Sequence, residues 1–127
     1  EVDYAHVKAE PHHPDALPRG YNTEVFWRRT LDRLDARTPA MSQREHITYQ
    51  IEHHPDFRYV RVPAPDGLAR PDYRLTLDTR DDFAMLERLC AECPVEATTP
   101  LAAVLHFLDA HPDIVAMNSQ VEQRKIE

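Results

Sequence analysis

The sequence predicts an α/β fold in which a mixed or largely parallel sheet is flanked by helices. Segments with the two-residue alternation of strands are interleaved with segments whose apolar residues recur at helical spacing. Prolines separate these segments, since the 127 residues include eleven prolines but only two glycines. A chain of this length buries a modest core. We therefore expect residues 1–127 to form a single domain, with a charged tail over 118–127 that frays.

In the first half of the chain, strands are expected over residues 2–7, 23–26 and 57–62, where the side chains alternate. A helix should begin near Phe26, because apolar residues recur there at partly helical spacing, and the dipeptide Thr38-Pro39 should end it. A second helix should open at the capping-box pair Ser42 and Glu45 and run to residue 54.

The most distinctive predicted unit is a strand that turns directly into a helix. Residues 73–78 alternate as a strand with two different faces, and Thr79 stands three residues before Asp82, the spacing of a capping-box variant. The strand would present Asp78 at its carboxyl end, where open α/β sheets place their ligands. Helical spacing follows at Phe83, Leu86, Leu89 and Cys90, and a last helix is expected between Thr98-Thr99-Pro100 and His111-Pro112.

Composition excludes several classes of function. The net charge is −7 and no block of Lys or Arg occurs, which argues against a nucleic-acid partner. No apolar run approaches the roughly 20 residues of a membrane span, and no signal peptide is visible. Two cysteines cannot form a secreted disulfide framework, so a cytoplasmic protein is expected. Two glycines cannot supply a Gly-rich phosphate loop.

Two places carry candidate chemistry. Arg44, Glu45 and His46 would lie in the first turn of a helix, where free backbone N–H groups favour a phosphate or a sugar carboxylate. From spacing alone, the simpler interpretation is that Glu45 only caps the helix. Asp78 could hold a divalent metal, although a lone Asp at a strand end is more often a turn former, and Mg²⁺ takes further ligands.

A structural zinc site is the alternative that the histidines and cysteines suggest. The pairs His12-His13 and His53-His54 look alike, and Cys90 and Cys93 have CxxC spacing. Both cysteines, however, fall on or just after the apolar face of a predicted helix, where free cysteines act as small hydrophobic residues. Asp81 and Asp82 are interpreted as support for the start of that helix.

Four segments, read in order, carry a family resemblance. They are residues 17–26 (LPRGYNTEVF), 44–48 (REHIT), 74–83 (RLTLDTRDDF) and 99–112 (TPLAAVLHFLDAHP). Together they resemble the second half of the spore-coat-polysaccharide type of sugar cytidylyltransferases, which are relatives of the synthetases that activate acidic sugars as CMP-sugars. The resemblance covers nearly all of the chain and implies a partial Rossmann-like nucleotidyltransferase fold.

The resemblance also implies roles for individual residues. Asp78 matches an Asp that is expected to bind Mg²⁺, Glu24 would face the acceptor sugar, and Arg44, Glu45 and His46 would contact the substrate. A sugar hydroxyl or phosphate would attack the α-phosphorus of CTP and release pyrophosphate, in bacterial surface polysaccharide biosynthesis.

The sequence departs from that family in one respect. The nucleotide-binding half, with its Gly- and Arg-bearing loop and a second metal-binding Asp, has no match in these residues. We therefore expect a sugar-side, carboxy-terminal half that binds CTP and sugar only in the complete enzyme, associates with itself, and is inactive alone. No residue is assigned as catalytic. Two alternatives stay open: a non-catalytic self-associating interaction module, and a His/Cys metal-binding module.

Overall fold

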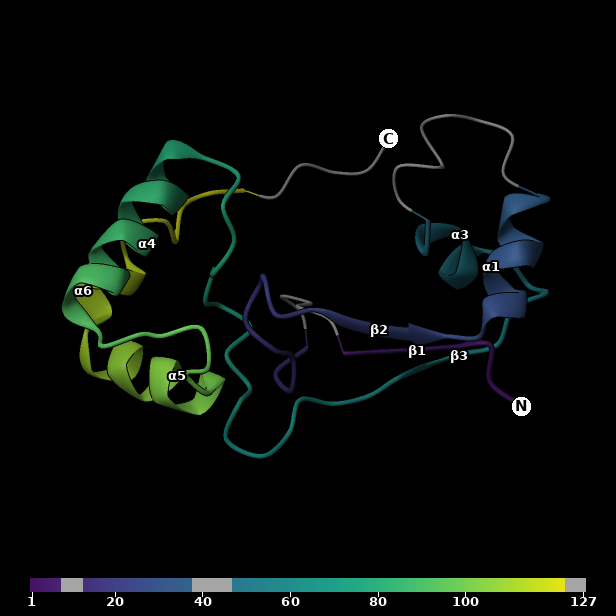
Figure 1. The fold of residues 1–127 in the computed structure, drawn as a ribbon, viewed down its shortest axis with the longest axis horizontal. Helices are drawn as coiled ribbons and strands as arrows, with labels where there is room; N and C mark the ends of the chain where they lie inside the picture. Colours follow the sequence, from purple (N-terminus) through teal and green to yellow (C-terminus); the bar gives the residue numbers. More distant parts are fainter. Residues whose placement is uncertain (8–12, 38–46, 123–127) are drawn as a thin grey trace. The chain divides into compact units, whose positions relative to one another are not determined.

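The computed structural model describes residues 1–7, 13–37 and 47–122. These residues fall into two compact units, which are described separately: residues 1–7, 23–37 and 47–62 form the first unit, and residues 13–22 and 63–122 form the second. That both form a single domain stays a prediction. The elements are β1 (Tyr4–Val7), β2 (Thr23–Phe26), α1 (Arg28–Asp35), α3 (Tyr49–His53), β3 (Tyr59–Arg61), α4 (Arg80–Glu92), α5 (Leu101–Ala110) and α6 (Pro112–Val115) (Figure 1).

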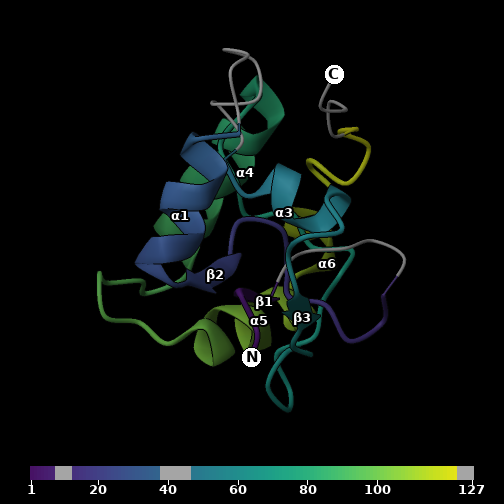
Figure 2. The same ribbon diagram turned by 90° about the vertical axis from the view of Figure 1, so that its right-hand side faces the viewer.

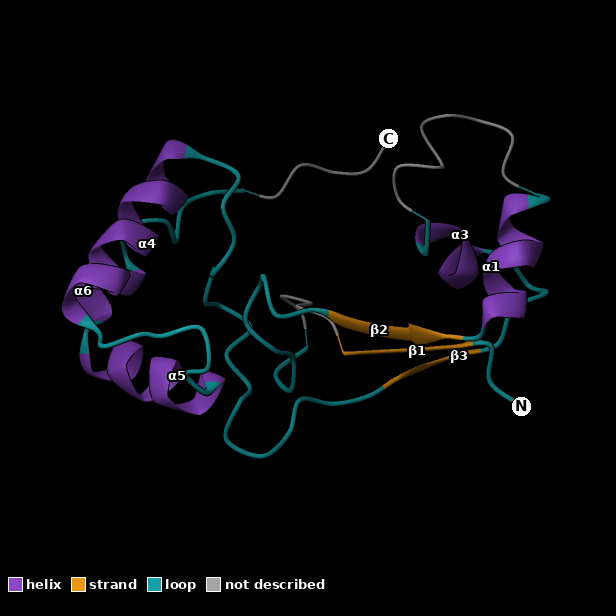
Figure 3. Cartoon of the chain, in the orientation of Figure 1, coloured by secondary structure: helices purple, strands orange, loops and turns teal. Residues whose placement is uncertain are grey.

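The first unit contains a mixed sheet in the order β2-β1-β3. Strand β1 pairs antiparallel with β2 and parallel with β3 (Figure 3). Helices α1 and α3 lie on the same face of this sheet (Figures 1 and 2). The expected mixed sheet flanked by helices is therefore confirmed, and all three strands of the first half form close to where alternation predicts them.

The core of the first unit lies between the sheet and the two helices. Tyr4 of β1, Leu34 of α1, Ile51 of α3 and Phe57 form one buried cluster. Because side chains alternate along a strand, Tyr4 and His6 of β1 are buried on this face, and Ala5 between them points to the opposite face. The predicted helix over 42–54 is described only from residue 47 onward, so its capping box lies outside the described residues.

The opposite face of the sheet is apolar and exposed. Register pairs Ala5 with Val25 on one side and with Val60 on the other, so these three residues share that face. Val62 joins them two residues after Val60. The side chains of Val25, Val60 and Val62 are 64%, 42% and 41% exposed. We call these three valines the outer face of the sheet.

The second unit is built from three helices around an aliphatic core. Met85 and Leu89 line one side of α4 and Cys93 follows its last residue, whereas Val104, Leu108 and Ile114 come from α5 and α6. Helices α4 and α5 confirm the two helices predicted for this half. The buried stripe of α4, however, is shifted from the predicted one: Phe83 and Cys90 are exposed, because the helix packs along positions spaced by four.

The strand predicted over residues 73–78 does not form. Only an isolated parallel bridge joins Arg74 to Arg19, through Arg19 N–H to Tyr73 O at 2.9 Å and Leu75 N–H to Arg19 O at 2.7 Å. The pairing does not extend, because the N–H groups that would continue it are used in turns: Tyr73 N–H donates to the Arg70 carbonyl oxygen at 3.0 Å, and Tyr21 N–H donates to that of Pro18 at 3.2 Å. Gly20, at φ 107°, also turns its chain away. Alternation identified the extended segment correctly but could not show that it has no partner strand among the described residues.

No helix in the part of the chain that the structure describes is long and apolar enough to cross a membrane.

Gly20→Ala should destabilise the protein by at least about 2 kcal/mol, because positive φ is strained for alanine. A Cβ at this position would also lie 2.1 Å from the Leu75 carbonyl oxygen. The measurement is the free energy of unfolding from urea denaturation followed by circular dichroism. Gly67→Ala is the matched control, since Gly67 also has positive φ but open space around it, and should cost only about 1 kcal/mol. Equal losses would show that the close approach at Gly20 is unimportant.

Candidate functional site

The centre of the candidate site is the carboxylate of Asp82, in the first turn of α4. Its side chain is fully buried. Thr79 Oγ1 accepts a hydrogen bond from Asp82 N–H at 3.2 Å, and Asp82 Oδ2 accepts from Thr79 N–H at 3.0 Å. The predicted capping box is therefore confirmed. The same Oδ2 also accepts from the N–H of Asp78 at 3.1 Å.

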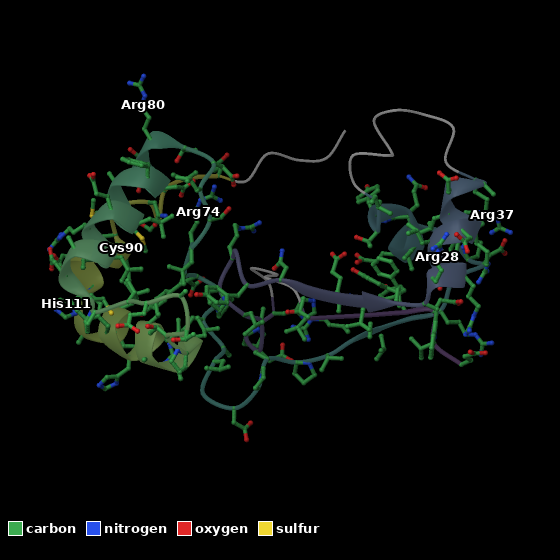
Figure 4. The ribbon with its side chains drawn as sticks, viewed as in Figure 1. Arg28, Arg37, Arg74, Arg80, Cys90 and His111 are labelled. Atoms are coloured by element: carbon green, nitrogen blue, oxygen red, sulfur yellow. The ribbon has the colours of Figure 1, made fainter. Side chains whose placement is uncertain are left out.

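Arg74 binds this carboxylate in a bidentate manner. Its Nε donates to Oδ1 of Asp82 at 2.7 Å and its Nη2 donates to Oδ2 at 2.9 Å. The guanidinium is itself buried, with 7% of the side chain exposed. Nη2 lies 3.0 Å from Oδ2 of Asp78 as well, so Arg74 bridges the two carboxylates. Figure 4 shows Arg74 beside α4, whereas Arg80, in the first turn of that helix, projects away from it.

Asn118 completes the shell around the ion pair. Its Nδ2 donates to Asp82 Oδ1 at 2.9 Å and to the carbonyl oxygen of Arg74 at 3.0 Å. Asn118 was expected to open a frayed tail, but only 1% of it is exposed. At this residue the structure differs from the expectation, because the amide supplies a donor that the buried carboxylate needs.

These contacts decide the charge of the site. The Arg74 guanidinium, with Asn118 and the backbone N–H of Asp78, holds the pKa of the Asp82 carboxyl well below its ordinary value, although burial acts in the opposite direction. The hydrogen bond to Asp82 in turn raises the pKa of Arg74. Both groups are therefore charged at neutral pH, and their charges compensate each other.

A second ion pair holds the loop before Arg74. Arg70 donates to both oxygens of Asp109 on α5, through Nε at 2.9 Å and Nη2 at 2.6 Å, and the Tyr73 hydroxyl donates to Oδ1 at 2.8 Å. Arg70 and Tyr73 together lower the pKa of Asp109 to about 2. The chain is thus anchored to α5 immediately before it reaches Arg74.

Asp78, the predicted metal ligand, has a fixed backbone and an accessible side chain. Its side chain is 53% exposed. Oδ2 accepts from Arg74 and from Thr76 Oγ1, at 3.0 and 3.3 Å, whereas Oδ1 accepts no hydrogen bond from the described residues. One carboxylate oxygen therefore remains that could bind a cation. Such an arrangement fits one ligand of a Mg²⁺ ion whose other ligands are phosphates, waters or another acid.

The other predicted residues have different outcomes. Glu24 lies on β2 of the first unit, exposed, with His6 as its register partner. Arg44, Glu45 and His46 lie outside the described residues. For the zinc alternative, Cys93 is buried and Cys90 exposed. Within residues 1–7, 13–37 and 47–122, no group of three or more His, Cys, Asp or Glu side chains gathers to hold a metal.

Sequence reasoning missed Arg74 and Asn118, and it took Asp82 only for a helix-capping residue. One signal was present: the positively charged Arg74 is followed at intervals of four residues by two negatively charged residues, Asp78 and Asp82. A spacing of four residues predicts an ion pair when both residues lie on one helix. It predicts none when the residues lie on either side of a turn that leads into a helix. Nothing in the residues around Asn118 indicates that its amide returns to a segment 44 residues earlier.

Asp82→Asn should lower the free energy of unfolding by about 3 kcal/mol at neutral pH, because it leaves Arg74 buried without a counter-charge. Since the pKa of Asp82 is lowered on folding, its contribution is complete above the unfolded value of about 4 and is lost as the pH falls below it. The unfolding free energy of Asp82→Asn should therefore fall less steeply with acid than that of the wild type, as measured by urea denaturation between pH 7 and 2.

Asp81→Asn is the matched control, because its carboxylate is exposed and accepts one hydrogen bond, from Gln120 at 3.1 Å. Its unfolding free energy should change by no more than about 0.5 kcal/mol. Equal effects of the two substitutions would contradict the assignment of Asp82 as the buried centre.

Comparison with known proteins finds two curated relatives. No family model matches the chain. An uncharacterized protein of Methanocaldococcus jannaschii is 31% identical over 106 residues, which cover 83% of this chain and 43% of the relative. The spore coat polysaccharide biosynthesis protein SpsF of Bacillus subtilis is 30% identical over 70 residues, which cover 54% and 29%. The aligned region spans less than half the length of each relative.

A solved structure shows the fold. A cytidylyltransferase from Leptospira borgpetersenii matches with a TM-score of 0.74 over 98% of this chain and 48% of that one, at 20% identity. The chain thus has an α/β nucleotidyltransferase fold, as the resemblance implied. Its sequence is similar to that of a spore coat polysaccharide biosynthesis protein, and its fold is that of a cytidylyltransferase.

Proposed function

We propose that this chain is the sugar-side part of a nucleotidyltransferase that transfers CMP from CTP to a sugar and releases pyrophosphate. The functions of the two similar proteins, polysaccharide biosynthesis and cytidylyl transfer, support this reaction class. The observation that carries the proposal is the position of Asp78. Its main chain is held by a buried ion pair, while its carboxylate stays accessible.

In this proposal Asp78 supplies one carboxylate ligand to Mg²⁺, and the metal neutralises charge on the phosphoryl oxygens. Arg74 holds Oδ2 and leaves Oδ1 for the ion. Asp82 fixes the backbone N–H of Asp78, so that the carboxylate is presented in one place. Glu24, Arg44, Glu45 and His46 are proposed to contact the sugar.

The chain is proposed to need a nucleotide-binding part for turnover. Phosphoryl transfer depends on groups that cradle the triphosphate, and Gly-rich loops commonly supply them. The 127 residues contain two glycines, which are too few for such a loop. Gly20 is moreover occupied in the close approach to Leu75.

The test is the release of pyrophosphate from CTP by the complete enzyme, in which this chain is joined to a nucleotide-binding part. Turnover should require Mg²⁺ and a sugar acceptor. Asp78→Ala should reduce it at least about a hundredfold, because a ligand to a charge-neutralising metal contributes several kcal/mol. Asp81→Ala, the neighbouring exposed acid, should leave the rate within about twofold of the wild type. Equal rates for Asp78→Ala and the wild type would remove Asp78 from the mechanism.

A second candidate function is a self-associating module, and the outer face of the sheet favours it. Val25 of β2, Val60 of β3 and Val62, just after β3, are all exposed. An apolar sheet face is commonly buried in association. The edge of β2 is likewise a place where another strand can pair.

Self-association should appear as a rise in average mass with concentration in sedimentation equilibrium. The double variant Val25→Lys, Val60→Lys should weaken it at least about tenfold, because charges do not enter an apolar interface. Leu77→Lys is the control, since Leu77 is 60% exposed but lies in the second unit. A wild-type protein that stays monomeric at all concentrations would eliminate this candidate.

A further inference from the structure

The extended segment before α4 is paired along one edge only. In a strand, the N–H and C=O groups of successive residues point to opposite edges. The C=O of Tyr73 and the N–H of Leu75 bind the backbone of Arg19, so that edge is occupied. The backbone groups of Arg74 and Thr76 therefore point to the other edge, where no strand lies among the described residues.

On this second edge, Thr76 is the residue whose backbone groups remain available. The C=O of Arg74 accepts from the Asn118 amide at 3.0 Å, and the N–H of Asp78 donates to the Asp82 carboxylate at 3.1 Å. Between them, the N–H and C=O of Thr76 form no hydrogen bond with the described residues. Because Thr76 is half-buried, these groups need a partner, either water or another segment of protein. The edge can thus form a short bridge with two hydrogen bonds, like the bridge on the opposite edge.

Two large apolar side chains are exposed close to this edge in the sequence. Leu77 is 60% exposed and Phe83, in α4, is 56% exposed. Neither belongs to the aliphatic core of the second unit, although Leu75, which shares the alternation with Leu77, packs against that core. Asp78, with its accessible carboxylate, lies between Leu77 and Phe83 in the sequence. Exposed apolar side chains beside an unpaired edge are typical of an interaction surface.

The length of a similar protein indicates what covers this surface. The structural match takes in 98% of this chain but 48% of the Leptospira borgpetersenii cytidylyltransferase, so more than half of that protein has no counterpart in these residues. The proposed function requires a nucleotide-binding part, and the further ligands of a Mg²⁺ ion on Asp78 must come from outside the described residues. A segment that pairs with Thr76 would pass next to this carboxylate, because one residue separates the two. The nucleotide-binding part is therefore the occupant that the surface fits best.

We propose that the backbone of Thr76 and the side chains of Leu77 and Phe83 form the surface on which an extended, apolar segment of the nucleotide-binding part docks. Thr76 supplies one N–H donor and one C=O acceptor to the segment, which covers the two apolar side chains as it binds. The inference rests on the proposed function and names the partner of its site. It gives Leu77 and Phe83 a role that is separate from that of the outer face of the sheet.

The test is hydrogen exchange at single backbone amides, measured by NMR in the absence of CTP, Mg²⁺ and sugar. The chain by itself is compared with the complete enzyme, in which it is joined to a nucleotide-binding part. We expect the Thr76 amide to exchange rapidly in the chain alone and at least about a hundredfold more slowly in the complete enzyme, because it gains a hydrogen-bond partner. The Leu75 amide is the internal control, since it already donates to Arg19 at 2.7 Å and should be protected in both.

Two substitutions test the apolar part of the surface. Leu77→Lys and Phe83→Lys should each speed up exchange at Thr76 in the complete enzyme at least about tenfold, because a lysine charge does not enter an apolar interface. Neither should shift the urea midpoint of the chain alone measurably, since both side chains are exposed there. Val25→Lys is the matched control, because Val25 is 64% exposed but lies in the first unit, and it should leave the protection of Thr76 unchanged.

The outcomes separate the inference from the proposed function. Equal exchange at Thr76 in the chain alone and in the complete enzyme, or full protection in both lysine variants, overturns the inference while Mg²⁺-dependent turnover can still hold. Protection in the chain alone that increases with its concentration assigns the surface to a second copy and likewise overturns the inference. Protection in the complete enzyme that Leu77→Lys and Phe83→Lys remove, without release of pyrophosphate from CTP, supports the surface and overturns the proposed reaction.

Discussion

The bidentate pair of Arg74 and Asp82 is the interaction on which the second unit depends. It joins the extended segment after the loop to the first turn of α4, and Asn118 connects both to the chain after α6. A buried carboxylate and a buried guanidinium are each costly alone, so the pair determines how the three segments meet. The aliphatic core around Met85 and Leu108 holds the helices together, but it does not specify at which residue α4 begins.

The same pair organises the candidate site without entering it. Asp82 holds the backbone of Asp78, and Arg74 takes one of its two carboxylate oxygens. The backbone of Arg19 pairs with the same extended segment, through hydrogen bonds with Tyr73 and Leu75. The site is thus a buried, charge-compensated ion pair with an accessible acid beside it.

Many of the helices and strands could be predicted from local sequence patterns, whereas most contacts of the candidate site could not. Strand β2 has the predicted bounds and Thr79 caps α4, because alternation and capping act within a few residues. The prediction of a strand over 73–78 was wrong, because strand formation needs a neighbouring strand to pair with and the alternation of side chains carries no information about one. Asn118 was missed because its partners lie 36 and 44 residues away.

The burial of Asn118 has a consequence for how the second unit assembles. The carboxylate of Asp82 and the carbonyl of Arg74 receive this donor only when residues from both ends of the unit have come together. Helix α4 can form early from its own capping box. If it packed before Asn118 was in place, however, the carboxylate of Asp82 would be buried with too few hydrogen-bond donors. We therefore expect partly packed intermediates to be destabilised and the unit to fold cooperatively, because the first turn of α4 needs a donor from the segment after α6.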